Sequence, residues 1–372
     1  MNVKIRKKCI FCDYPLEELY LEKNLKIPLS CFTTEKEEEG IFLPYNIYTC
    51  KKCKTLQIKY LGDLKEIYKV NHADNTGVIM KNLHKEVSKI IIKYKREINN
   101  IVEIGSSKGT LSDLVLENNI VNKYYIIEPN YIGNNNTQKI IIDDFVENVD
   151  FKNIESNTLI ISHVFEHFYN PLEILKLISD NKKLEYFFLI WPDLEYYKDN
   201  NIYHILNTEH TFYVDNNFII NLLNNHSFKL IEKQNYLGHS VIFIFKRDVS
   251  LKLCELVNTN YNFEKYFKNL EMMETKILKI ITNLGKESKN KNICLWPASV
   301  HNQYFLMFAK KLKIDYFLDN SINKIDKYLY GYKIKILDFN KAKQSKENII
   351  FLNGGVFNSE VFDTNCKNMY EL

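Results

Sequence analysis

An alternation of buried-strand and helical patterns over residues 84–246 constrains the fold most strongly. Five short apolar runs each predict one buried strand, at residues 101–105, 124–128, 139–142, 158–162 and 186–190. Three segments have the apolar spacing of amphipathic helices, at residues 84–99, 171–180 and 216–225. Two further strand patterns, 228–236 and 240–246, close the segment. We therefore expect an α/β doubly wound sheet that ends in an antiparallel hairpin.

A glycine turn and a carboxylate follow the first two predicted strands. In sheets of this kind, ligands lie at the carboxyl ends of the strands. Gly105 and Gly109 in VEIGSSKG come directly after the first strand, where the missing side chains let a ligand approach the backbone. Glu128 ends the second strand and can accept hydrogen bonds from two ribose hydroxyls. The G-x-G-x-x-G turn of nicotinamide binders is missing, which favours S-adenosylmethionine (SAM) over NAD.

Asp144 and Phe145 follow the third predicted strand. We expect them to border an adenine by hydrogen bonding and stacking. The alternative is an ordinary surface turn, because loop residues often have no functional role.

Polar side chains gather in two later segments. His163, Glu166 and His167 follow the fourth strand in SHVFEH, and Glu209-His210 begins EHTFY. Buried polar groups need partners, so these clusters are more typical of a site than of a core. The histidine spacing could suggest a metal, but HVFEH starts at a strand end, unlike H-E-x-x-H on a helix, and the sequence places no clear third ligand. We therefore predict no catalytic metal here.

Four cysteines form two C-x2-C pairs, Cys9 with Cys12 and Cys50 with Cys53. Two such pairs supply the tetrahedral sulfur set that Zn²⁺ prefers. Four thiolates leave no open coordination position, so we expect this zinc to be structural. The alternative is four unrelated buried thiols.

Length and charge limit the class of protein. A chain of 372 residues predicts several domains. Its net charge of +4, from 50 basic and 46 acidic residues, calls for no polyanion, so nucleic acid binding is not indicated. No run of eighteen apolar residues and no signal-peptide core occurs, so we expect a cytoplasmic protein without a membrane span.

The motifs VEIGSSKG, IIEPN, HVFEHFYNP and EHTFY, behind paired C-x2-C knuckles, together carry a family resemblance. The chain resembles the three-domain SAM-dependent methyltransferases related to the C-methyltransferases of nucleotide-linked deoxysugars. The segments CLWPASVHNQYFL and DYFLDNSINKIDKYLYGYKI resemble that family's carboxyl-terminal Rossmann-like domain. The resemblance implies a zinc-binding module over residues 1–70, a class I methyltransferase core over 71–248 and a Rossmann-like domain over 249–372, with a helix at 265–286 leading into it.

Residue roles follow from the resemblance. It implies zinc on Cys9, Cys12, Cys50 and Cys53. His167, Glu209 and His210 would face a small-molecule acceptor such as a nucleotide sugar or a capsule precursor, with His210 as proton acceptor. Alternatively, His210 caps the helix at 216–225 or packs against Tyr213. The residues assigned to SAM are Glu103, Gly105, Gly109, Glu128, Asp144, Phe145 and His163.

Three departures from the family pattern leave carbon and oxygen acceptors both open. Asn207 stands where the family has tyrosine, Glu166 where alanine is common, and the segment before the core reads VNHADNTG, residues 70–77. An RNA methyltransferase and a non-catalytic binding protein are the alternative functions. In the last domain, the turn at Ala298-Ser299 could hold an anionic group of the acceptor or could be purely structural.

Overall fold

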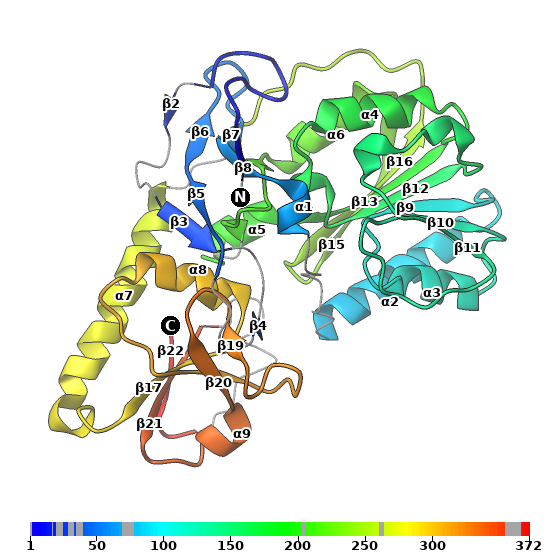
Figure 1. Ribbon diagram of the computed structural model, residues 1–372. Helices are drawn as coiled ribbons and strands as arrows, with labels where there is room; N and C mark the ends of the chain where they lie inside the picture. Colours follow the sequence, from blue (N-terminus) through cyan, green and yellow to red (C-terminus); the bar gives the residue numbers. More distant parts are fainter. Residues whose placement is uncertain are drawn as a thin grey trace.

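The computed structural model describes residues 2–16, 18–19, 25–28, 33–34, 40–68, 78–202, 205–259, 264–353 and 366–372. Figure 1 shows two sheet-containing bodies with a smaller group of strands beside them. The segment VNHADNTG lies outside the described residues.

A seven-stranded sheet forms the core of the middle of the chain. Its order is β11-β10-β9-β12-β13-β16-β15, and only β16 runs antiparallel to its neighbours. This is the Rossmann-like sheet of class I methyltransferases, so the predicted fold class is confirmed. The strands are β9 (Ile101–Ile104), β10 (Tyr124–Ile127), β11 (Lys139–Ile142), β12 (Thr158–Ser162), β13 (Tyr186–Pro192), β15 (Phe228–Tyr236) and β16 (Ser240–Arg247).

Helices cover both faces of this sheet, with α2 and α3 on one side and α4 and α6 on the other (Figure 1). Successive residues of a strand point to opposite faces. Tyr124 and Ile126 accordingly pack in the cluster that includes α2 and α3, while Tyr125 and Ile127 pack in the cluster that includes α4 and α6. The helices are α2 (Val78–Lys93), α3 (Thr110–Glu117), α4 (Pro171–Asp180), α5 (Leu194–Asp199) and α6 (Asn216–Asn224).

The amino-terminal part consists of short strands and one short helix. The pair β1·β8 and the hairpin β3·β5 are antiparallel, and a four-stranded sheet has the order β14-β7-β6-β2. The elements are β1 (Val3–Ile5), β2 (Glu18–Leu19), β3 (Leu25–Pro28), β5 (Phe42–Tyr45), β6 (Ile47–Thr49), β7 (Leu56–Ile58), β8 (Tyr60–Gly62), α1 (Leu64–Ile67) and β14 (Phe212–Tyr213).

The last part of the chain forms a second α/β body with the order β22-β21-β17-β18-β20-β19-β4. The first four pairings in this order, from β22 to β20, are parallel, as predicted for a Rossmann-like domain. The elements are α7 (Glu264–Leu284), β17 (Asn292–Trp296), α8 (Val300–Phe308), β18 (Tyr316–Asp319), β19 (Tyr328–Leu329), β20 (Ile334–Asp338), α9 (Phe339–Ala342), β21 (Asn348–Leu352), β22 (Met369–Glu371) and β4 (Thr33–Thr34).

The domain boundaries at residues 70 and 248 stay a prediction. Two short strands pair with strands of a different predicted unit. Phe212–Tyr213 joins the amino-terminal sheet, and Thr33–Thr34 joins the carboxyl-terminal sheet. The amino-terminal and carboxyl-terminal units therefore each contain an edge strand from another part of the chain. In the part of the chain that the structure describes, no helix combines the length and apolarity that a bilayer crossing needs.

Candidate functional site

The four knuckle cysteines converge. Cys9 Sγ lies 3.5 Å from Cys53 Sγ, Cys12 Sγ lies 3.5 Å from Cys50 Sγ, and all four sulfurs lie within 4.8 Å of one another. The Cys9 sulfur also accepts hydrogen bonds from the Phe11 backbone N–H at 3.4 Å and from the Gln57 amide at 3.0 Å. The thiol of Cys53, then these donors, lower the pKa of Cys9 to about 4. Four cysteine sulfurs in this arrangement could hold a zinc ion.

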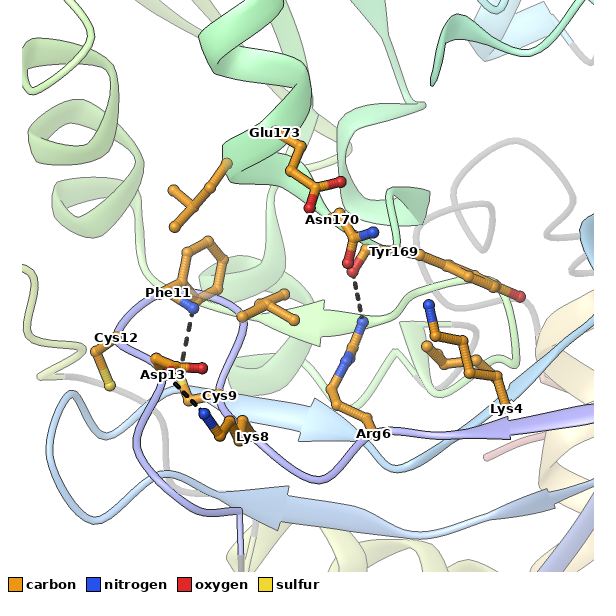
Figure 2. Close-up of a pocket in the computed structure, with 13 residues that line it drawn as sticks. Lys4, Arg6, Lys8, Cys9, Phe11, Cys12, Asp13, Tyr169, Asn170 and Glu173 are labelled. Carbon is orange, nitrogen blue, oxygen red and sulfur yellow. Dashed lines mark hydrogen bonds and ion pairs between the residues drawn. The ribbon is translucent and has the colours of Figure 1, made fainter. Parts of the chain in front are cut away.

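This cysteine module is tied to the segment that carries Glu209 and His210. Strand β14, directly after that pair, pairs with β7 of the module. Arg6 donates to the carbonyl oxygens of Thr211 at 2.8 Å, Ile58 at 3.1 Å and Tyr169 at 3.1 Å. Figure 2 shows the last of these bonds beside a cavity of about 460 Å³ between the module and the start of α4. The lining of that cavity includes Cys9 and Cys12 but no residue predicted to bind SAM or the acceptor.

The glycine turn after β9 has the backbone that its sequence requires. Gly105 and Gly109 have φ values of +77° and +70°, and Gly109 is the residue before α3. A Cβ added at Gly105 would lie 2.2 Å from a methyl carbon of Val164. Any larger residue at Gly105 therefore disturbs the fold.

Two carboxylates hold this turn. Glu128 accepts from the backbone N–H groups of Ser107 at 2.9 Å and Asn130 at 3.1 Å, one on each oxygen. Each oxygen can accept a further bond, as a ribose would require. Glu103 is buried and accepts from the hydroxyls of Ser106 at 2.7 Å and Tyr124 at 2.9 Å. Burial raises the pKa of both carboxyl groups, that of Glu103 to about 7.

Asp144 and Phe145 lie at the predicted place after β11. The Asp144 carboxylate accepts from the Phe145 backbone N–H and the Asn148 amide, each at 2.7 Å. The Phe145 ring lies 6.5 Å, between centroids, from the ring of Tyr68. Their predicted contact with an adenine stays a prediction.

Tyr68, which the sequence analysis did not identify, connects the two halves of the candidate site. Its carbonyl oxygen accepts from the Asn130 amide, next to Glu128. Its hydroxyl lies 3.0 Å from His167 Nδ1 and 3.5 Å from a Glu209 oxygen. Tyr68 lies two residues before VNHADNTG, the segment that departs from the family pattern, and this position was the one indication in the sequence.

The histidine cluster surrounds Glu166, whose side chain is only 1% exposed. One oxygen, Oε1, lies 3.7 Å from His163 Nδ1, 4.0 Å from His167 Nε2 and 3.9 Å from His210 Nε2. Burial raises the pKa of Glu166 to about 7. Three-dimensional folding brings His210, from a later segment, to the HVFEH segment, so that ligand atoms of Glu166, His167 and His210 lie within 4.8 Å of one another. The expectation of no catalytic metal stays a prediction.

His163, assigned to the cofactor from sequence, lies in this cluster, and its predicted contact with SAM stays a prediction. Its Nε2 lies 2.8 Å from Ser240 Oγ, which also lies 2.7 Å from His239 Nδ1. Burial lowers the pKa of His163 to about 4 and that of His239 to about 3. Both rings are thus neutral at pH 7. Ser240 and His239 were missed because the hairpin turn that holds them gives no motif.

The departure at Asn207 has a physical explanation. Its side-chain oxygen accepts from the backbone N–H groups of Glu209 at 2.9 Å and His210 at 2.7 Å, which fixes the turn that presents both side chains. Asp215, not His210, caps α6. The alternative contact with Tyr213 does occur, at 6.4 Å between ring centroids.

Residues 250–368 match the family model described as "C-methyltransferase C-terminal domain", which supports methyltransferase activity. No curated protein matches the chain. Among solved structures, the bacterial CtHen1-C methyltransferase domain is 9% identical, with a TM-score of 0.38 over 46% of this chain and 100% of its own.

Two further solved structures show similar values. An O-methyltransferase family protein from Burkholderia thailandensis is 9% identical, with a TM-score of 0.36 over 46% of this chain and 58% of its own. Human N-acetylserotonin methyltransferase, solved with SAM, is 10% identical, with a TM-score of 0.35 over 51% of this chain and 63% of its own.

Proposed function

We propose that this chain is a SAM-dependent methyltransferase whose acceptor is a sugar carried on a nucleotide or a glycan, methylated at carbon or oxygen. The observation that carries the proposal is the cluster of His167, Glu209 and His210 beside Tyr68, at the same sheet edge as the glycine turn and Glu128. The resemblance to sugar C-methyltransferases supports the acceptor class, and the match over residues 250–368 supports the transfer.

The cofactor half of the site is the glycine turn with Glu103, Glu128, Asp144 and Phe145. When bound, SAM supplies an electrophilic methyl group. Glu128 would accept from the ribose hydroxyls, Asp144 and Phe145 would border the adenine, and Glu103 would hold the turn in position through Ser106.

The acceptor half must align a nucleophile and remove its proton, because methyl transfer is an in-line displacement. An imidazole suits proton removal near neutral pH. His210 is the first candidate and His167 the second. Asn207 fixes the backbone of His210, and Tyr68 with Glu209 orients His167.

A labelled-methyl assay against a panel of nucleotide sugars tests this function, and we expect a methylated sugar. Glu128→Ala should weaken S-adenosylhomocysteine binding by about 1 to 3 kcal/mol in calorimetry, since it removes a charged hydrogen-bond acceptor. His210→Asn should lower turnover by about 100-fold while binding persists.

The exposed Glu117 of α3 provides the control, and Glu117→Ala should change neither measurement. Unchanged cofactor affinity in Glu128→Ala would contradict the cofactor site. Methyl transfer to RNA, with RNA binding that weakens steeply as the salt concentration rises, would show that the acceptor is a nucleic acid and not a sugar.

A further inference from the structure

The atoms around Glu166 are separated by distances that a hydrogen bond does not explain. Glu166 Oε1 lies 4.0 Å from His167 Nε2 and 3.9 Å from His210 Nε2, and hydrogen bonds between such atoms are about 2.7 to 3.2 Å long. Two bonds of about 2.1 Å from nitrogen or oxygen to one metal ion span at most about 4.2 Å. At tetrahedral angles such ligand atoms lie about 3.4 Å apart. The two separations exceed this value by about 0.5 Å, a difference that side-chain rotation can close.

Glu166 itself points to a missing partner. Its side chain is 1% exposed, and among the described residues neither carboxylate oxygen has a hydrogen-bond partner other than the backbone N–H of Glu166 itself. Removing a carboxylate from water without a partner costs several kcal/mol, so an unpaired one is rare in a folded protein. A cation placed between Glu166 Oε1 and the imidazoles of His167 and His210 would be the partner of this carboxylate.

The Tyr68 hydroxyl lies 3.0 Å from His167 Nδ1 and 3.5 Å from a Glu209 oxygen. If Tyr68 donates to Glu209, its oxygen accepts from Nδ1–H of His167. This tautomer leaves a lone pair on Nε2, directed at a carboxylate oxygen that also carries lone pairs. Two such atoms repel each other unless a cation lies between them. A histidine ligand whose other ring nitrogen donates to a neighbouring group is the usual arrangement around protein metals.

We propose that Glu166, His167 and His210 bind one divalent first-row transition-metal ion through a carboxylate oxygen and two Nε2 atoms. Two imidazoles and one carboxylate suit zinc, manganese, iron(II) and cobalt(II), and three protein ligands leave coordination positions open. This site is separate from the four cysteines, which fill a coordination sphere by themselves.

Metal binding does not depend on the proposed methyl transfer, but its consequence for the reaction does rest on it. An ion with open positions could bind an acceptor oxygen and increase its acidity. When the metal is bound, the Nε2 lone pair of His210 is a ligand and cannot accept a proton. The ion then promotes loss of the acceptor proton, which in the metal-free site is the role of His210.

Cobalt(II) is the probe, because its visible spectrum reports the ligands. Protein whose cysteine cluster is filled with zinc should bind one further equivalent of cobalt, with ligand-field bands and without a thiolate-to-cobalt charge-transfer band. Glu166→Gln should weaken this binding by about 100-fold or more, since even the loss of a group behind a ligand costs 10- to 100-fold. Glu117→Gln, the same change on an exposed helix, should bind cobalt like the parent protein.

X-ray absorption at the cobalt edge needs no mutation, and it covers the case in which Glu166→Gln fails to fold. Two imidazole ligands, an oxygen ligand and no sulfur are expected. Absence of the bands, a sulfur ligand, or unchanged binding in Glu166→Gln would overturn the site. None of these measurements requires SAM or an acceptor, so a failure here leaves the proposed function to be judged by the labelled-methyl assay.

Discussion

At the scale of single residues, Glu103 makes folding depend on pH. It is 3% exposed, and burial raises its pKa to about 7 from an ordinary value of 4.5. Between these two values the folded chain binds more protons than the unfolded chain, so stability falls as pH rises. The loss is complete above about pH 7 and amounts to at most about 3 kcal/mol, at 1.36 kcal/mol for each pKa unit.

Glu103→Gln should remove this dependence, because an amide resembles the protonated acid. We expect the variant to be more stable than the parent at pH 8, by up to about 3 kcal/mol, and nearly equal to it at pH 4.5. Urea unfolding at pH 4.5, 6 and 8 measures the difference. Glu147→Gln, at an exposed carboxylate, is the control. A constant difference between parent and Glu103→Gln across this range would show that Glu103 titrates normally.

At the scale of elements, the cysteine module positions the candidate acceptor side chains. Strand β7 pairs with β14, and the Thr211 carbonyl accepts from both Arg6 and the Ile58 backbone N–H. Thr211 N–H in turn donates to the Glu166 carbonyl oxygen at 2.9 Å. A disturbance of the knuckles should therefore reach Glu209, His210 and Glu166 through the backbone, while the glycine turn is held by other elements.

We expect Cys12→Ser, at the most exposed of the four cysteines, to lose the zinc ion. Zinc released by thiol-modifying reagents should then be measurable from the parent protein but not from the variant. Turnover should fall by about 100-fold, since a displacement of about 1 Å in a site has that effect. Calorimetry should show unchanged S-adenosylhomocysteine affinity. The matched change Cys254→Ser, at a cysteine outside the cluster, should have no effect on zinc. Full turnover in zinc-free Cys12→Ser would show that the zinc knuckles do not position the acceptor side chains.

Most strands of the central sheet could be predicted because they are apolar runs, and β15 because its residues alternate between the two faces. Every residue of β9, β10 and β13 is buried. The strand Phe212–Tyr213 could not be predicted, because two residues show no periodicity and their partners, Gln57 and Leu56, are far earlier in the chain. Tyr68 and Asn207 could not be identified as site residues from the sequence either. Their roles are hydrogen bonds to residues that only the folded chain brings near.

At the scale of the whole molecule, the turn after β17 is held by hydrogen bonds to polar groups of the carboxyl-terminal body itself. Ser299 caps α8, and Lys324 donates to the Ala298 carbonyl oxygen at 2.8 Å and to Asp319 at 2.9 Å. Ala298 is fully buried. These contacts favour a structural role for the Ala298-Ser299 turn over the capture of an anionic acceptor group.

We accordingly expect Lys324→Gln to lower the free energy of unfolding by about 1 to 3 kcal/mol, because it leaves Asp319 without its charged partner. The KM for the acceptor should not change. Urea unfolding and steady-state kinetics give the two values, with exposed Lys346→Gln as control. A tenfold higher KM with parental stability would instead place the acceptor at this turn.

The pairing of Thr33–Thr34 with Tyr328–Leu329 has a consequence for the order of folding. The outer strand of the last sheet comes from the first tenth of the chain, so during synthesis it emerges long before its partner exists. Contacts between such distant segments form slowly. Once made, this contact covers the edge of β19, an edge that would otherwise be open to strands of other molecules. A nascent chain released before residue 328 would leave Thr33–Thr34 without this partner, so truncated products should be more prone to aggregate than the finished protein.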